Sequence, residues 1–239
     1  MERDGGGWTG AEAASALSWW ADAGVDVLVA EEPRDWLKAR QATPAEVKAP
    51  AEPALAELPQ QLPLFRAWLA DAEALPYAAP GARRLCPEGD PSAGLMILID
   101  MPAAEDCRSG RLLSGDAGKL LDRMLAAIGR DRASVYLAAV SCIRSPSGSF
   151  DPASAGACAD LARHHIALAD PRAVLLLGDA CARALLGKAV APMRAAWREI
   201  GTPRGGFKAV ATFSPDFLLR NPAAKAQAWA DLQLLMEGL

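Results

Sequence analysis

The sequence predicts an α/β protein in which a mostly parallel central sheet is covered on both faces by helices. Runs dominated by apolar residues at 95–99, 134–140 and 173–178 are typical of strands that are buried on both faces. Helical patterns at 117–129 and 158–170 separate these runs, and residues 208–213 predict a fourth strand. Because strands and helices alternate, we expect a three-layer α/β/α sandwich.

The carboxyl ends of parallel strands meet at one edge of such a sheet, and this edge is where ligands bind. The segments that follow Ile99, Val140, Gly178 and Phe213 are therefore expected to converge on one site.

The chain before the sheet has a different composition. Residues 1–40 combine a helical pattern with a strand-like run, 41–64 are rich in Ala, Pro and Glu like a linker, and 65–84 predict a connecting helix. The main domain is then expected over residues 85–239.

Charge is distributed unevenly along the chain. The first 106 residues carry 8 Lys and Arg against 18 Asp and Glu, whereas the remaining residues carry 17 against 11. A basic C-terminal part suits a nucleic acid backbone, and the acidic N-terminal part is a candidate surface for a protein partner.

Several other classes of protein are disfavoured by the sequence. No apolar run is long enough to cross a bilayer and the first residues do not resemble a signal peptide, so we expect a soluble cytoplasmic protein. The five cysteines form no CxxC pair, and neither a metal site nor a disulfide framework is expected. Phosphate-loop and dinucleotide motifs are missing, so no nucleotide cofactor is expected.

Asp100 ends the first apolar run and is a candidate to orient a water molecule, although capping the next turn would explain an acid there equally well. Pro102 stiffens the turn that follows. The segment from Gly110 to Gly118 is expected to lead into a helix whose first amides bind a phosphate or a base edge. Arg144 lies in a Ser- and Pro-rich loop and suits a backbone phosphate, with a solvated arginine as the alternative.

The stretch SPDFLLRNP, which begins at Ser214, is expected to be a loop that engages DNA. It opens at Pro215 and presents Phe217, Leu218 and Leu219 beside Arg220. An exposed apolar wedge next to a cation is what a protein needs to turn a base out of a duplex. The alternative is that these leucines start the final helix and pack inward.

Taken in order, several segments resemble the uracil-DNA glycosylase superfamily, and its bacterial iron-sulfur branch most closely. They are LIDMPAAEDCRSGRLLSGDAGKLLDRMLAAIG, SVYLAAVSCIRSPSGSFDP, PRAVLLLG, TFSPDFLLR and KAQAWADL. The resemblance extends over roughly residues 85–239 and implies a uracil-DNA glycosylase-like fold.

The resemblance also implies roles for individual residues. Asp100 matches the acid that assists attack of water, whereas Ser214 stands where the family has a histidine that stabilises the departing base. Leu113 stands at the family's stacking aromatic and Ala139 at its uracil-reading asparagine. Of the four cluster cysteines only Cys158 is matched, so the iron-sulfur cluster is expected to be lost.

These observations predict a DNA repair protein that hydrolyses the N-glycosidic bond of a flipped uracil or other deaminated base in damaged or single-stranded DNA, with weak or altered activity. The alternatives are a catalytically silent DNA-binding member of the superfamily that acts with a repair partner and, with less support, a general α/β protein that binds another protein. The predicted catalytic residues are Asp100 and Ser214. The predicted base pocket consists of Met101, Pro102, Leu113, Ser114, Gly115 and Ala139. The predicted DNA-binding residues are Arg144, Pro215, Phe217, Leu218, Leu219 and Arg220.

Overall fold

The computed structural model describes residues 11, 14–15, 18–20 and 58–239. Most of the predicted N-terminal segment (1–40) and linker (41–64) lies outside these residues. By its internal contacts the chain divides into two units, Met1–Val47 and Lys48–Leu239, and the fold described below belongs to the second.

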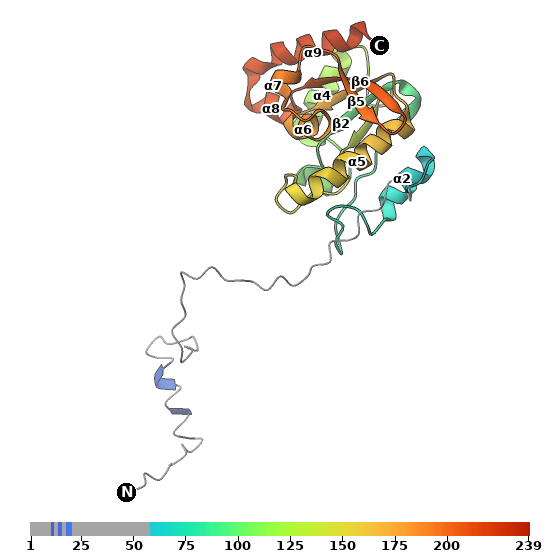
Figure 1. The fold of residues 1–239 in the computed structure, drawn as a ribbon. Coiled ribbons are helices and arrows are strands. Elements are labelled where there is room, and N and C mark those ends of the chain that lie inside the picture. The colour runs from blue at the N-terminus through green and yellow to red at the C-terminus, as the bar shows by residue number, and fades with distance from the viewer. Residues whose placement is uncertain (1–10, 12–13, 16–17, 21–57) are drawn as a thin grey trace. The chain divides into compact units, whose positions relative to one another are not determined.

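The second unit is the predicted α/β/α sandwich (Figure 1). Its elements are α2 (Leu62–Asp71), β1 (Glu88–Gly89), η2 (Pro91–Ala93), β2 (Leu95–Ile99), α3 (Ala104–Ser109), α4 (Gly115–Ala127), β3 (Tyr136–Ala139), α5 (Pro152–Ala169), β4 (Ala173–Leu177), α6 (Asp179–Leu186), α7 (Val190–Met193), β5 (Arg198–Thr202), β6 (Gly205–Thr212), α8 (Pro215–Arg220), η3 (Pro222–Ala224) and α9 (Lys225–Glu237).

The six-stranded sheet has the order β1-β3-β2-β4-β6-β5. The inner strands β3, β2, β4 and β6 are parallel, and the short edge strands β1 and β5 are antiparallel to their neighbours. All four predicted strands are present and form this parallel centre, so the predicted fold class is confirmed. Neither edge strand was predicted.

Alternate residues of the central strands face the two helical layers, because successive side chains of a strand point to opposite faces. In β2, Leu95, Ile97 and Ile99 join the core beneath α4, α8 and α9, whereas Met96 and Leu98 join the core beneath α5 and α6. Both faces of the sheet are therefore buried beneath helices, which explains why these strands are apolar throughout.

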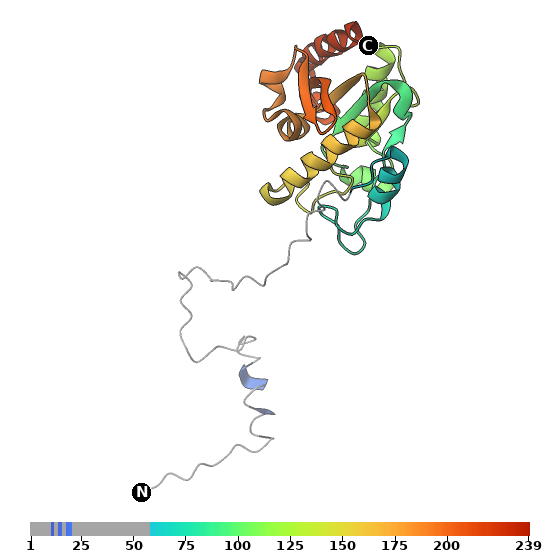
Figure 2. The same ribbon diagram turned by 45° about the vertical axis from the view of Figure 1, so that its right-hand side comes forward.

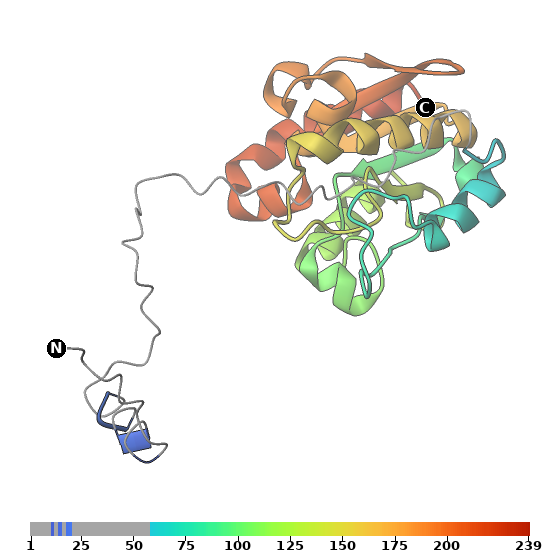
Figure 3. The same cartoon turned by 60° about the horizontal axis from the view of Figure 1, so that its bottom comes forward.

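A third, smaller core lies under α2, which packs against α5 (Figures 2 and 3). The predicted connecting helix of residues 65–84 corresponds to α2, which begins at Leu62 and ends at Asp71. Phe65 is fully buried, and its ring lies 5.1 Å from that of His164 and 5.2 Å from that of His165. Within the described residues, no helix is long and apolar enough to span a membrane.

Candidate active site

The carboxyl ends of β2, β4 and β6 open onto a cleft of about 540 Å³. It lies where the chain switches sides of the sheet, because β2 is followed by β3 on one side and the chain then returns to β4 on the other. Seven predicted site residues line the cleft: Asp100, Met101, Leu113, Ser214, Pro215, Phe217 and Arg220.

Three of the four segments predicted to converge contribute to the cleft, namely those after Ile99, Gly178 and Phe213. The segment after Val140 does not line it. Its Arg144 donates from the guanidinium Nη1 to the Pro102 carbonyl at 3.0 Å, and Pro102, predicted in the base pocket, does not itself line the cleft, although its neighbours Met101 and Ala103 do. Arg144 is thus held by the protein and is not a freely solvated arginine.

Asp100 sits at the floor of the cleft, immediately after β2. One carboxylate oxygen, Oδ1, accepts the backbone amide of Met101 at 2.8 Å. Burial raises the pKa of the Asp100 carboxyl, and although the hydrogen bond from the Met101 amide lowers it, the pKa stays above its ordinary value. The negative charge of Asp216 raises this pKa by a smaller amount, and the positive charge of Arg144 lowers it. A partly buried carboxylate of raised pKa accepts a proton from water more readily than a solvated one, as a general base must.

Ser214 lines the same cleft as Asp100 but has a structural task as well. It is the N-cap of α8, and its Oγ accepts the Phe217 amide at 3.3 Å. Its hydroxyl hydrogen remains available for one neutral hydrogen bond. Gly178 comes so close that a Cβ there would lie 3.1 Å from the Ser214 Cβ, and its φ of +99° is one that other residues rarely adopt.

The expected loop after Phe213 is a helix, α8, and the prediction of Leu218 as a DNA wedge is wrong. Leu218 is 1% exposed and belongs to the core beneath α4 and α9. A serine cap followed by Pro215 at the first helical position starts the helix, and helical spacing then turns Pro215 and Leu218 inward. Phe217 and Leu219 remain exposed, at 36% and 42%.

Phe217 also shapes the cleft. Its ring stacks on that of Phe213, with centroids 4.8 Å apart and planes inclined by 21°. Both rings line the cleft and give it one aromatic wall. The role of Phe213 was not predicted, since a strand-end phenylalanine looks like ordinary core in a sequence.

The loop that carries Leu113 is held by a buried acid, Asp106, which sequence analysis did not identify. Asp106 is 1% exposed and accepts the Ala103 amide at 3.0 Å and both the amide and hydroxyl of Ser114 at 2.7 Å. Arg132 holds the same loop by donating to the Leu112 carbonyl at 2.8 Å and to that of Leu113 at 2.6 Å. Asp106 thus occupies the Ser114 amide, whereas phosphate or base binding by the first amides of the following helix, α4, stays a prediction.

Ser114 and Gly115 line an adjoining hollow of about 210 Å³, together with Leu219, and not the main cleft. Ala139, predicted in the base pocket, lines a different cavity beneath α2. The physical reason is the strand order. Ala139 ends β3, which lies on the far side of β2 from β4, so its carboxyl end does not reach the switch point.

Comparison with known proteins identifies this architecture. The family model described as the Uracil DNA glycosylase superfamily matches residues 86–233, and the chain belongs to this superfamily. It is 27% identical over 162 residues to a type-4 uracil-DNA glycosylase of Pyrobaculum aerophilum, covering 63% of this chain and 81% of that protein. It is 29% identical over 136 residues to a type-4 uracil-DNA glycosylase of Thermotoga maritima, covering 56% of this chain and 70% of that protein.

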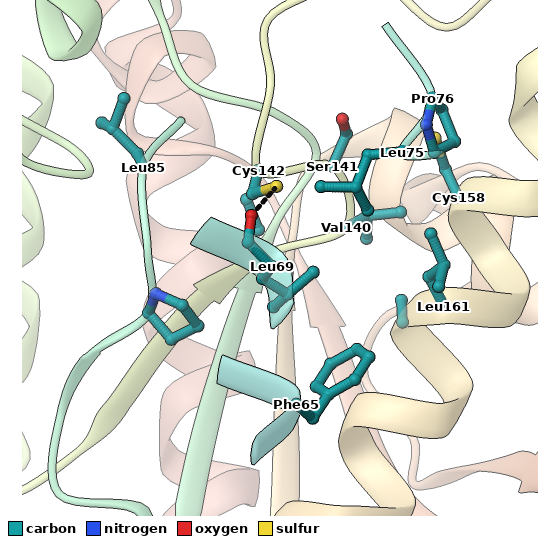
Figure 4. Close-up of a pocket in the computed structure, with 13 residues that line it drawn as sticks. Phe65, Leu69, Leu75, Pro76, Leu85, Val140, Ser141, Cys142, Cys158 and Leu161 are labelled. Carbon is teal, nitrogen blue, oxygen red and sulfur yellow. Dashed lines mark hydrogen bonds between the residues drawn. The ribbon is translucent and has the colours of Figure 1, made fainter. Parts of the chain in front are cut away.

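The cavity beneath α2 contains Cys158, the cysteine that matches a ligand of the family's iron-sulfur cluster (Figure 4). Cys142 and Cys158 both line it, so one thiol more than the sequence comparison matched faces this space. The cavity holds only about 20 Å³, and the facing wall is apolar, formed by Phe65, Leu69 and Leu75.

The residues around this cavity do not suit a cluster. Within the described part of the chain, only two thiols, those of Cys142 and Cys158, line the cavity. The Cys142 Sγ lies 3.9 Å from the Leu69 carbonyl oxygen. Two thiols in an apolar cavity of this size do not match the four thiolates that hold a cluster.

Proposed function

We propose that this protein is a DNA glycosylase that hydrolyses the N-glycosidic bond of a damaged base turned out of DNA into the cleft. The observation that carries the proposal is the position of Asp100, a partly buried carboxylate at the switch point of a uracil-DNA glycosylase superfamily fold. The cleft is also of the size of ordinary small-molecule sites, which occupy about 300–1,000 Å³.

In the proposed reaction, Asp100 orients a water molecule and accepts its proton as the water oxygen bonds to C1′ of the sugar. The bond between C1′ and the base nitrogen breaks, and its electron pair leaves with the base. Ser214 donates its one neutral hydrogen bond to the departing base. Phe213 and Phe217 supply a surface on which the base stacks.

The mouth of the cleft supports a role in holding DNA. Arg220 is exposed there, with its Nε near the Asp216 carbonyl at 3.3 Å, and its remaining guanidinium donors face solvent. The exposed side chains of Phe217 and Leu219 lie on the same helix and are the candidates to fill the space that a flipped base leaves. Leu218 has no part in this because it is buried.

A catalytically silent DNA-binding protein is the second candidate. It is favoured by the two base-reading positions, since Leu113 carries no aromatic ring and Ala139 lies outside the cleft. Both candidates require DNA binding, and only the first requires Asp100 to act.

The deciding experiment incubates the full chain, in excess, with labelled oligonucleotides that contain uracil, hypoxanthine, xanthine or an alkylated purine, and scores abasic sites. Asp100→Asn is the test variant, because a general base contributes about 100- to 10,000-fold in rate. Asp160→Asn is the matched control, since Asp160 is an exposed acid on α5 that does not line the cleft. Product that disappears only with Asp100→Asn supports the glycosylase, and salt-dependent binding without product from any base supports the silent protein.

A further inference from the structure

The charge of the cleft lining is unusual for an enzyme that expels an anion. Four aspartates line it, Asp100, Asp106, Asp179 and Asp216, against a single cation, Arg220. The lining residues include no lysine and no histidine. A base such as uracil departs with a negative charge, which this lining opposes.

The hydrogen-bond donors of the cleft do not correct this imbalance. Ser214 offers one neutral donor, and its Oγ is already tied to the start of α8. The N-terminus of α6 also faces the cleft, and its partial positive charge would suit an anion. Asp179 stands in that first turn, accepts the Val190 amide at 2.8 Å, and offsets this charge.

The same lining suits a base that is positively charged. A cation is stabilised by nearby carboxylates and by the face of an aromatic ring. The stacked rings of Phe213 and Phe217 form such a wall, and the exposed residue Asp216, in the first turn of α8, also lines the cleft. Met101 and Leu113 complete an apolar contact surface.

We propose that the cleft takes a cationic base, a purine alkylated at N3 or N7 in DNA; this inference rests on the glycosylase function proposed above. Such a nucleotide is positively charged when it binds and remains so up to the transition state. The positive charge begins on the purine and moves toward the sugar as the bond from C1′ to N9 lengthens. Carboxylates around the cleft therefore stabilise the transition state as well as the bound base.

The chemistry balances without a cationic residue. The water oxygen bonds to C1′ while its proton passes to the Asp100 carboxylate. The electron pair of the bond between C1′ and N9 moves onto the purine and cancels its positive charge. The alkylated base leaves neutral, so the histidine that an anionic leaving group needs is not required at Ser214.

The test measures free bases released by the full chain, in excess, from duplex DNA treated with dimethyl sulfate, which carries 7-methylguanine and 3-methyladenine. A duplex that contains uracil is assayed in parallel, and treated DNA without protein corrects for spontaneous loss. We expect methylated purines to be released at least about tenfold faster than uracil. Asp216→Asn should slow their release by about tenfold, whereas Asp160→Asn should not change it.

A reciprocal variant sharpens the result. Ser214→His adds a donor that can be positively charged, so it should raise the rate for uracil relative to methylated purines. If wild-type protein releases uracil as fast as methylated purines or faster, the inference about cationic bases is wrong and the glycosylase function stands. If no base of any kind is released, the proposed function and this inference both fail.

Discussion

Replacement of Phe65 by alanine tests whether α2 is an integral part of the folded unit or only a connection, as the sequence suggested. Phe65 is fully buried between the rings of His164, His165 and Trp68, the last with centroids 5.7 Å apart. Removal of a buried phenylalanine typically costs about 3–5 kcal/mol, because transfer energy is lost and a cavity remains. For a unit of this size, that corresponds to a decrease in Tm of roughly 8–15 °C.

The adjacent residue provides the control. Leu64 is on the same helix and is 56% exposed, so Leu64→Ala should change stability by no more than about 0.5 kcal/mol. Both variants are compared with wild type by urea denaturation followed by circular dichroism. If Phe65→Ala costs less than about 1 kcal/mol, as an exposed site would, then α2 does not contribute to cooperative folding.

Three further predictions concern two buried polar residues, Asp231 and His165, and a glycine that lines the cleft, Gly178. Asp231 is fully buried and accepts hydrogen bonds from the Thr212 hydroxyl at 2.8 Å and from the Arg194 Nε at 3.2 Å. Asp231→Ala should lower the free energy of unfolding, measured by urea denaturation, by about 3–5 kcal/mol because the Arg194 guanidinium loses its carboxylate partner. A decrease below about 1 kcal/mol would contradict this role. Burial lowers the pKa of His165 from 6.5 to about 3, so only the unfolded chain binds a proton between these pH values. The contribution of neutral His165 to the free energy of unfolding should therefore be fully present above pH 6.5 and decrease by up to about 1.4 kcal/mol per pH unit below that value. His165→Gln should make the free energy of unfolding less dependent on pH between pH 6.5 and 4, and an unchanged pH dependence would contradict the lowered pKa of His165. Gly178→Ala should cost about 1–3 kcal/mol, because of its positive φ, and should also slow base release by displacing Ser214; a variant with wild-type rate and stability would refute the close approach.

The fold could be predicted because strands that are buried on both faces consist almost entirely of apolar residues. The runs at 95–99 and 173–177 are apolar at every position, and only a strand covered on both faces requires this. The edge strand β5 (Arg198–Thr202) buries only Ile200, so its sequence resembles a polar connection. Edge strands are defined by their neighbours in space, and the local sequence holds little trace of them.

The site was predicted in part for a similar reason. Asp100 could be identified because it directly follows a buried strand, and Ser214 because it follows another. Asp106 and Gly178 could not be identified, because their roles depend on residues elsewhere in the chain. Asp106 acts by accepting the Ser114 amide, and Gly178 acts by allowing the close approach of Ser214. Leu218 was misplaced because an apolar triplet after proline fits an exposed loop and a buried helix equally well.

The loop around Leu113 is held by hydrogen bonds to its backbone and by the burial of the Leu112 and Leu113 side chains. Asp106 accepts the Ser114 amide at one end of the loop, and Arg132 donates to the carbonyls of Leu112 and Leu113. None of these hydrogen bonds involves the side chain at position 113. The Leu113 side chain is nevertheless buried in the core beneath α4, and its φ is +47°, which few residues other than glycine adopt. A substitution at this position would therefore change the lining of the cleft and the packing beneath the loop together, while the hydrogen bonds that hold the loop stay in place.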